Sequence, residues 1–391
     1  MELLLQNITW WNGTEKITGD IRILKNVIGE TGKLQPKKNE TTIDFTGHFI
    51  YPGLINAHDH LEMNLYSRLG KPGYNNYIEW SSEIYKPETS PVKEIEKVDI
   101  KDRLLWGALK NLVSGATTVV HHNPWHRSFG QPEFPVRVLK QMNWAHSLAF
   151  GGDVKSKFKD GVPFVIHAAE GVDDVAFSEL SKLDSIGLLQ ENTVLIHCIA
   201  IEQDATGKFY NGKFSVVWCP ESNMFMFGRT APVEKMKDKI RVAIGTDSMM
   251  TGSATLLDEM RASEKTHKVT SVEIMNMVTR NAAAIFNLPV PEIQTGRPAD
   301  LFIVKAGVDD YVQNLLTVNP SDIVLVMVNG NIRLQNASIE NKSWKSVKYM
   351  VTIGGALKKT DVDVASLKKR IGKYVPKDIL EKNPLWNLIE A

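Results

Sequence analysis

Short apolar runs alternate with turn residues over the first fifty residues of the chain. The runs ELLLQNITWW (2–11), DIRILKNVIG (20–29) and TTIDFTGHFI (41–50) are separated by segments rich in Gly, Asn and Lys. A period of two residues is typical of strands whose two faces differ in polarity. The pattern predicts a small antiparallel sheet in this region.

From Tyr51 the pattern changes to apolar runs that are each followed by a helical or loop stretch. The runs are GLINAH (53–58), GATTVVHH (115–122), DGVPFVIHAAE (160–170), TVLIHCIAI (193–201), FSVVWCP (214–220) and RVAIGTDS (241–248). Alternation of strand and helix indicates a parallel sheet, and this many units predict a closed (β/α)8 barrel of the TIM type.

Two parts of the chain depart from a regular barrel. Between His122 and Phe164 only VRVLKQM and NWAHSLAF resemble strands, so the third and fourth units are expected to be reduced. From Leu301 the strands LFIVKA and DIVLVMVNGNIRLQN return. We therefore expect an α/β protein with a barrel over residues 51–298 and a discontinuous β-sandwich domain over residues 1–50 and 299–391.

Two histidines stand two residues apart in INAHDHLEMN (55–64), after the apolar run FIYPGLI. If this run is a strand, residues i and i+2 point to the same side, so His58 and His60 face one space. That spacing suits metal ligands. A hydrogen-bonded pair in a polar core is the alternative interpretation of the motif taken alone.

Three further polar signals occur in the apolar runs. In VIHAAE, Glu170 lies three residues after His167. His197 lies in the middle of the β-type run LIHCIA, and Asp247 follows a glycine in AIGTDS. Taken alone, His197 is typical of a hydrogen-bonded core histidine, Glu170 of a surface carboxylate and Asp247 of a helix cap. Their shared position at strand ends favours a common site over coincidence.

A barrel gathers the carboxyl ends of its strands into one pocket. There His58, His60, His167 and Asp247 offer three neutral nitrogens and one carboxylate. This set suits one divalent transition metal with an open position for water, which the metal activates for hydrolysis at neutral pH.

Composition narrows the classes of partner. The 391 residues are 43% hydrophobic and carry 46 basic against 45 acidic residues, for a net charge of +1. Neither nucleic acid nor an anionic membrane is favoured by this balance, so we expect a small-molecule substrate and leave a homo-oligomer open. The first residues lack a basic flank, and no stretch approaches ~18 apolar residues, which predicts a cytoplasmic protein. Cys198 and Cys219 are expected to be buried thiols.

The motifs resemble those of the amidohydrolase superfamily, in its branch of cytosine, guanine and adenosyl-type deaminases and triazine hydrolases. The resemblance rests on PGLINAHDH, GATTVV, HAAE, WCPESNMFMFG, GTDS, LLDEMR, TRNAAAIFNL and GRPADLFIV, and on LEMNLYSRLG with YIEW and Pro87. It extends from the N-terminus to about residue 330 and implies a barrel flanked by a sheet domain from both termini.

The resemblance also implies roles for single residues. Glu170 is expected to shuttle a proton, and His197 to orient the nucleophile or polarise the substrate. Asp247 is expected both to hold the metal and to take a proton from water. Departures from the family pattern affect the substrate pocket: Glu62 stands where an uncharged residue is common, and TGSAT replaces an Asn-rich stretch after the aspartate.

We therefore expect a hydrolase that attacks a C–N bond with metal-bound hydroxide and deaminates an aminated heterocycle, with one zinc, or alternatively iron, per chain. A cyclic or secondary amide hydrolase, a two-metal hydrolase with Lys140 near the second ion, and a catalytically idle relative are the alternatives. Glu62, His122, Trp125 and His146 are candidate substrate contacts. The segment 342–382, with eleven Lys/Arg against four Asp/Glu, is assigned no function.

Overall fold

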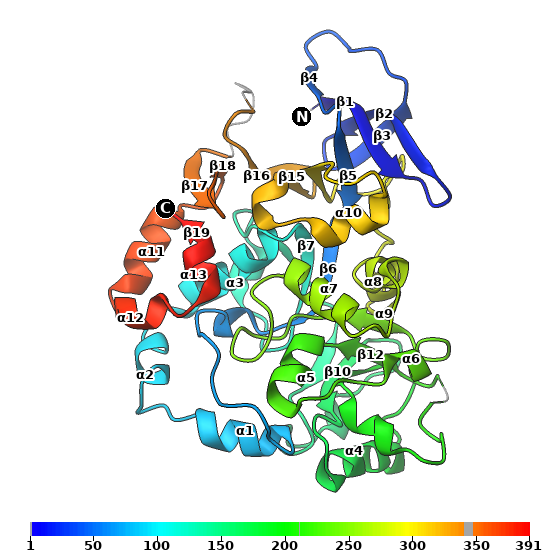
Figure 1. The fold of residues 1–391 in the computed structure, drawn as a ribbon, viewed down its shortest axis with the longest axis vertical. Coiled ribbons are helices and arrows are strands. Elements are labelled where there is room, and N and C mark those ends of the chain that lie inside the picture. Colours follow the sequence, from blue (N-terminus) through cyan, green and yellow to red (C-terminus); the bar gives the residue numbers. More distant parts are fainter. Residues whose placement is uncertain (1, 211, 340–346) are drawn as a thin grey trace.

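Strands from the two ends of the chain pair in one sheet. The computed structural model describes residues 2–210, 212–339 and 347–391 (Figure 1). Among these residues an 11-stranded sheet has the order β19-β17-β18-β16-β15-β14-β5-β1-β2-β3, with β4 beside β1. Its strands are β1 (Glu2–Trp11), β2 (Lys16–Leu24), β3 (Val27–Gly32), β4 (Thr41–Asp44), β5 (His48–Pro52), β14 (Leu301–Lys305), β15 (Ile323–Val328), β16 (Asn331–Asn336), β17 (Tyr349–Ile353), β18 (Ala356–Thr360) and β19 (Ile389–Glu390).

The join between the two ends of the chain is the antiparallel pairing of β5 with β14, in which Tyr51 lies opposite Phe302. The expectation of a purely antiparallel N-terminal sheet is wrong, because β4 and β5 both run parallel to β1. Alternating apolar residues predict a strand but carry no signal for its direction.

The middle of the chain forms parallel strands in two sheets of order β6-β7-β8 and β13-β12-β11-β10-β9. In chain order these are β6 (Leu54–Asp59), β7 (Ala116–His121), β8 (Arg137–Val138), β9 (Asn143–Ala145), β10 (Phe164–Ala168), β11 (Thr193–His197), β12 (Ser215–Trp218) and β13 (Val242–Ile244). Every residue of β6, β7, β10 and β11 is buried, as expected for parallel strands covered on both faces.

Helices follow most of these strands. They are α1 (Tyr77–Ile84), α2 (Val92–Ile95), α3 (Ile100–Leu112), α4 (Asp174–Ser185), α5 (Pro220–Phe227), α6 (Val233–Met236), α7 (Leu256–Lys265), α8 (Ser271–Met277), α9 (Arg280–Ile285) and α10 (Tyr311–Thr317), with the 3-10 turns η1 (Leu61–Met63), η2 (Arg127–Gly130), η3 (Lys155–Lys157), η4 (Ile199–Gln203) and η5 (Pro320–Asp322). Side chains cap the longer ones: Asp99 accepts from the backbone of α3, Asp173 from α4 and Thr255 from α7.

The third and fourth units are short, as the sequence predicts. Residues 139–142 join β8 to β9, and the turn η3 is the element between β9 and β10 in the described part of the chain. β8 and β9 also belong to different sheets, so this is where the two parallel sheets separate. Cys198 and Cys219 are free and buried, as expected.

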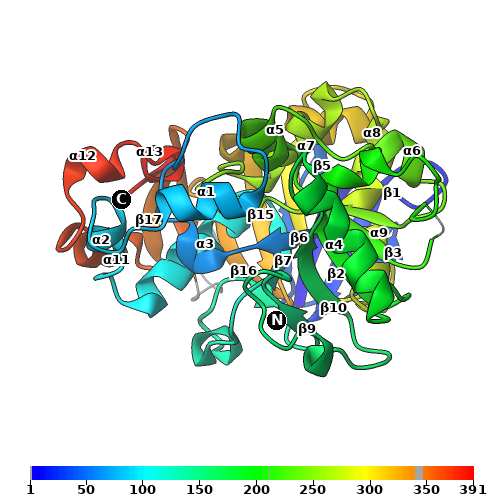
Figure 2. The ribbon, with the colours of Figure 1, turned by 90° about the horizontal axis from the view of Figure 1, so that it is seen from below.

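The C-terminal helices pack beside α2 and α3 (Figures 1 and 2). They are α11 (Val364–Gly372), α12 (Lys377–Leu380) and α13 (Pro384–Leu388). Arg370 of α11 donates to both carboxylate oxygens of Asp102 on α3, at 2.7 and 2.8 Å. The basic segment thus contributes at least one cation to an internal contact, whereas its residues 342–346 lie outside the described residues. None of the described helices combines the length and the apolar character that a membrane span requires.

The backbone of η1, which follows His60, lies directly against α3. A Cβ added to Gly107 of α3 would lie 2.2 Å from the carbonyl oxygen of Leu61, so no side chain fits there. A Cβ added to Gly372 of α11 would have no other atom within 4 Å. These two helical glycines therefore form a matched pair.

We predict that Gly107→Ala lowers the free energy of unfolding by ~1–3 kcal/mol through overpacking against Leu61. Gly372→Ala is expected to leave it unchanged or raise it by up to ~1 kcal/mol, because alanine favours the helix. Denaturant titration of both variants measures the difference. A Gly107→Ala protein at least as stable as the parent would contradict the described contact.

Candidate metal and catalytic site

Four buried histidines meet at the carboxyl ends of the parallel strands. His58 lies in β6, and His60 is the first residue after this strand. His122 follows β7, and His167 lies in β10. One ring nitrogen from each of the four lies within 4.8 Å of the other three. Three of them were expected as ligands, whereas His122 was expected only as a substrate contact. The shared face predicted for His58 and His60 is therefore present.

The ring nitrogens are oriented by backbone contacts. His167 Nδ1 donates to the carbonyl oxygen of His146 at 2.6 Å, so its Nε2 carries the lone pair. That Nε2 lies 3.3 Å from Nε2 of His58. The backbone of His146 thus turns the free nitrogen of His167 toward His58. Histidines that bind metals are commonly oriented by such a hydrogen bond from their second ring nitrogen.

Burial keeps three of these four rings neutral. It lowers the pKa of His60, His122 and His167 well below 6.5, and the neighbouring imidazoles lower each pKa further. Neutral imidazole is the form that binds a metal ion. The donor set therefore fits a divalent transition metal, and buried nitrogens such as His58 Nδ1 and His122 Nδ1 have no hydrogen-bond partner among the described residues.

Asp247 approaches this cluster from the loop after β13. Its Oδ1 lies 3.7 Å from Nε2 of both His58 and His60. Burial opposes its ionisation, but the adjacent imidazole of His58 and other nearby histidines hold the pKa of Asp247 well below its usual value. The carboxylate also accepts from Ser222 Oγ at 2.9 Å and from Thr251 Oγ1 at 3.0 Å.

Glu170 and His197 face each other next to Asp247. Glu170 Oε1 lies 3.5 Å from His197 Nε2, and burial, together with the charge of Asp247, raises the pKa of Glu170 well above 4.5. His197 Nδ1 donates to Asn223 Oδ1 at 2.8 Å, and burial lowers the pKa of His197 to about 4. The arrangement thus pairs a carboxyl group that retains its proton with an imidazole nitrogen that carries a lone pair.

His197 is the last residue of β11, not the middle of a strand as expected. The backbone of His197 has φ 72° and that of Cys198 has φ 53°, both in the left-handed region. Ala169 and Asp247 share this conformation, with φ 52° and 55°. Such conformations concentrate where the surrounding structure holds a functional side chain in place. They are set by tertiary contacts, so the apolar letters around His197 give no sign of them.

The remaining candidate contacts are dispersed. Glu62 is largely buried, its Oε1 accepts from Asn123 Nδ2 at 2.5 Å, and burial raises its pKa. The His146 ring lies 4.9 Å from that of His167. Trp125 is 40% exposed, and the Nζ of Lys140, also an exposed residue, lies 5.5 Å from its ring centroid.

Ser222 and Asn223 come from helix α5 and were not assigned roles from the sequence, although the motif WCPESN contains them. The first turn of α5 is anchored from α7, because Glu259 Oε1 accepts from the backbone N–H of Glu221 at 3.0 Å. Glu259 is fully buried, and burial raises its pKa to about 8. The contact of Ser222 with Asp247 and that of Asn223 with His197 thus depend on the position of α5, which the buried carboxyl of Glu259 anchors.

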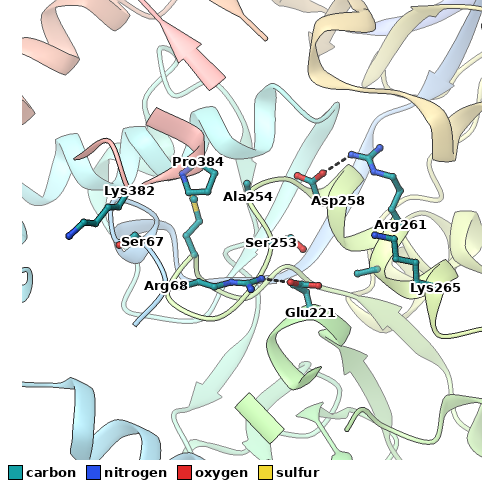
Figure 3. A pocket seen from close by; sticks show the side chains of 13 residues that line it. Ser67, Arg68, Glu221, Ser253, Ala254, Asp258, Arg261, Lys265, Lys382 and Pro384 are labelled. Atoms are coloured by element: carbon teal, nitrogen blue, oxygen red, sulfur yellow. Dashed lines mark hydrogen bonds and ion pairs between the residues drawn. The ribbon is translucent and has the colours of Figure 1, made fainter. Parts of the chain in front are cut away.

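A polar pocket of about 620 Å³ lies next to the segments that carry Asp247 and Ser222 (Figure 3). It is lined by Met249 and Ser253 from the loop after Asp247 and by Arg68 and Glu221, which form an ion pair. None of the four clustered histidines is among its lining residues, so we assign the pocket no part in holding a metal.

Comparison with known proteins finds that part of the chain is similar to amidohydrolases. Residues 153–333 match the model of the amidohydrolase family. A 5-methylthioadenosine/S-adenosylhomocysteine deaminase of Thermoanaerobacter pseudethanolicus is 24% identical, over 90% of this chain and 98% of the relative. A 5'-deoxyadenosine deaminase of Methanosphaera stadtmanae is 24% identical, over 82% and 90%.

Solved structures with a similar fold are also found. A zinc-bound adenosine deaminase from Xanthomonas campestris superposes with a TM-score of 0.75 at 15% identity, covering 97% of this chain and 98% of that one. A zinc complex of an atrazine chlorohydrolase from Arthrobacter aurescens gives 0.71 at 16% identity, over 96% and 100%. The predicted resemblance to the deaminase and triazine hydrolase branch is confirmed.

The buried carboxyl of Glu259 gives a stability prediction. Its pKa of about 8 lies above the 4.5 of an unfolded chain, so the folded protein keeps a proton that the unfolded protein loses. Stability is therefore lost as pH rises from about 5 to about 8. Glu259→Gln retains an acceptor for Glu221 but cannot ionise. We therefore expect the free energy of unfolding of the variant, relative to that of the parent, to increase across this pH range by a few kcal/mol, at ~1.4 kcal/mol per unit of pKa difference.

Denaturant titrations at several pH values measure this gain. Glu264→Gln, a partly exposed carboxyl on the same helix α7, is the matched control, for which no pH-dependent gain is expected. A constant difference between Glu259→Gln and the parent over this range would show that Glu259 is ionised throughout.

Proposed function

We propose that this chain is a metal-dependent hydrolase of the amidohydrolase superfamily that deaminates an aminated heterocycle of the adenosine type. The observation that carries the proposal is the convergence of neutral imidazoles, an ionised Asp247 and a proton-retaining Glu170 in one buried site. The names of the relatives favour an aminated purine nucleoside as substrate, and the zinc in the adenosine deaminase structure favours zinc.

The proposed ligands are those predicted from the sequence, namely His58, His60, His167 and Asp247. When bound, the metal lowers the pKa of a water molecule and so supplies the nucleophile at neutral pH. A single ion is proposed because Lys140, the candidate residue for a second metal, is exposed and lies over the ring of Trp125.

The protein's own groups then move the protons. Asp247, ionised within the site, accepts a proton from the attacking water. Glu170, which retains its proton, donates it to the ring or leaving nitrogen of the substrate. Because Nδ1 of His197 donates to Asn223, its Nε2 is an acceptor, which favours orienting the water over the predicted alternative of polarising the substrate. Ammonia leaves. Glu62 and His146 remain proposed substrate contacts.

The finer features of the fold belong to the same proposal. We propose that the two parallel sheets form one (β/α)8 barrel over residues 51–298, supported by the bond from Asp247 N to His58 O at 3.0 Å, which ties the end of β13 to β6. Residues 1–50 and 299–391 are proposed as the second, β-sandwich domain, supported by their shared sheet. Cytoplasmic location remains a prediction from the sequence.

The first test is metal content together with substrate turnover. We expect about one zinc per chain, loss of turnover after chelation and recovery after zinc is restored. A screen of aminated purine nucleosides, pyrimidines, pterins and cyclic amides separates the activities: ammonia release supports deamination, whereas ring opening without ammonia identifies an amide hydrolase. No turnover on any class by zinc-loaded protein would favour an idle relative.

The second test concerns Glu170. Glu170→Gln keeps the size of the side chain but cannot transfer a proton, so turnover is expected to fall by at least ~10² while the zinc content stays at one per chain. Glu191→Gln, an exposed carboxyl before β11, is the control and should keep parental turnover. Parental turnover by Glu170→Gln would move the proton transfer to another group.

A further inference from the structure

His122 follows β7 and is fully buried. Its Nε2 lies 2.9 Å from the carbonyl oxygen of Ala145. A carbonyl oxygen only accepts, so Nε2 carries the proton and donates it. In the neutral ring the lone pair is then on Nδ1, which is buried and has no hydrogen-bond partner among the described residues.

This ring lies among the proposed metal ligands. Its centroid is 4.4 Å from that of His167, 5.1 Å from His58 and 5.7 Å from His60. One of its nitrogens belongs to the group of four that lie within 4.8 Å of each other. By contrast His121, the preceding residue, accepts from the backbone N–H of Leu61 through its Nδ1 and stands outside the group.

An isolated buried acceptor is costly unless something binds it. The imidazoles of His58, His60 and His167, all buried, lie around this ring. A cation bound among these rings would satisfy the lone pair of His122 Nδ1, and imidazoles are ligands that zinc accepts.

We propose that His122 is a metal ligand, so that four imidazoles instead of three hold the ion beside Asp247. The proposal rests on the proposed function in one respect, that a metal occupies this cluster. His122, which follows the second parallel strand β7, thereby becomes a ligand, whereas the sequence pattern suggests it only as a substrate contact.

The direct test uses the unaltered zinc-loaded protein. X-ray absorption at the zinc edge counts imidazole ligands by their scattering, and we expect four. A count of three would overturn the proposal while leaving the proposed function in place. Absence of bound zinc in the parent protein would instead remove the proposed function itself.

Two variants test the same point by affinity. His122→Phe keeps a ring stacked on His167, and His122→Gln keeps a donor that can reach Ala145. We expect both to bind zinc more than ~100-fold more weakly in chelator competition, beyond the ~10–100-fold typical of residues outside a ligand set. The visible absorption of the cobalt-substituted protein, which reports ligand number, should change in both.

His146→Phe is the matched control, because its ring lies 4.9 Å from that of His167 but outside the group of four. It should retain zinc affinity within ~100-fold of the parent and an unchanged cobalt spectrum. Parental cobalt spectra in both His122 variants, with circular dichroism showing that they are folded, would overturn the proposal.

Discussion

A buried ammonium group underlies the geometry of the site. Lys110 of α3 is fully buried, and its Nζ donates to Asn64 Oδ1 at 2.9 Å, to Thr246 Oγ1 at 2.9 Å and to the carbonyl oxygen of Asp247 at 2.8 Å. It also lies 3.4 Å from the carboxylate of Asp59. A buried charge is tolerated only when it is paired and hydrogen-bonded. Satisfying Lys110 therefore fixes the end of β6 and the segment after β13, which carry the paired histidines and Asp247.

Contacts between segments far apart in the sequence, such as those of Lys110, explain why the fold is more predictable from the sequence than its details. The mostly apolar runs of β10 and β11 predict buried parallel strands because local composition reports burial on both faces. The reduced third and fourth units followed from the shortage of apolar runs before Phe164. Strand ends and directions were less accessible: the end of β11 depends on left-handed backbone at His197 and Cys198, and the parallel course of β4 and β5 depends on long-range pairing.

The candidate site divides in a similar way. His58 and His60 were found because two residues on one strand face share a direction, and Glu170 because it follows His167 closely. His122 was seen only as a substrate contact, since its place in the cluster depends on the spatial neighbourhood of β7 and β10. Ser222 and Asn223 lie in a visible motif, yet their contacts to Asp247 and His197 require the three-dimensional course of α5.

The central claim is that a metal ion is held where the imidazoles converge beside Asp247. Crystals of the zinc-loaded protein, measured on both sides of the zinc absorption edge, locate the ion directly. The account predicts one strong anomalous peak per chain, within bonding distance of ring nitrogens of His58, His60 and His167. A peak elsewhere in the molecule, or none among these histidines in crystals of protein shown to be active, would contradict it.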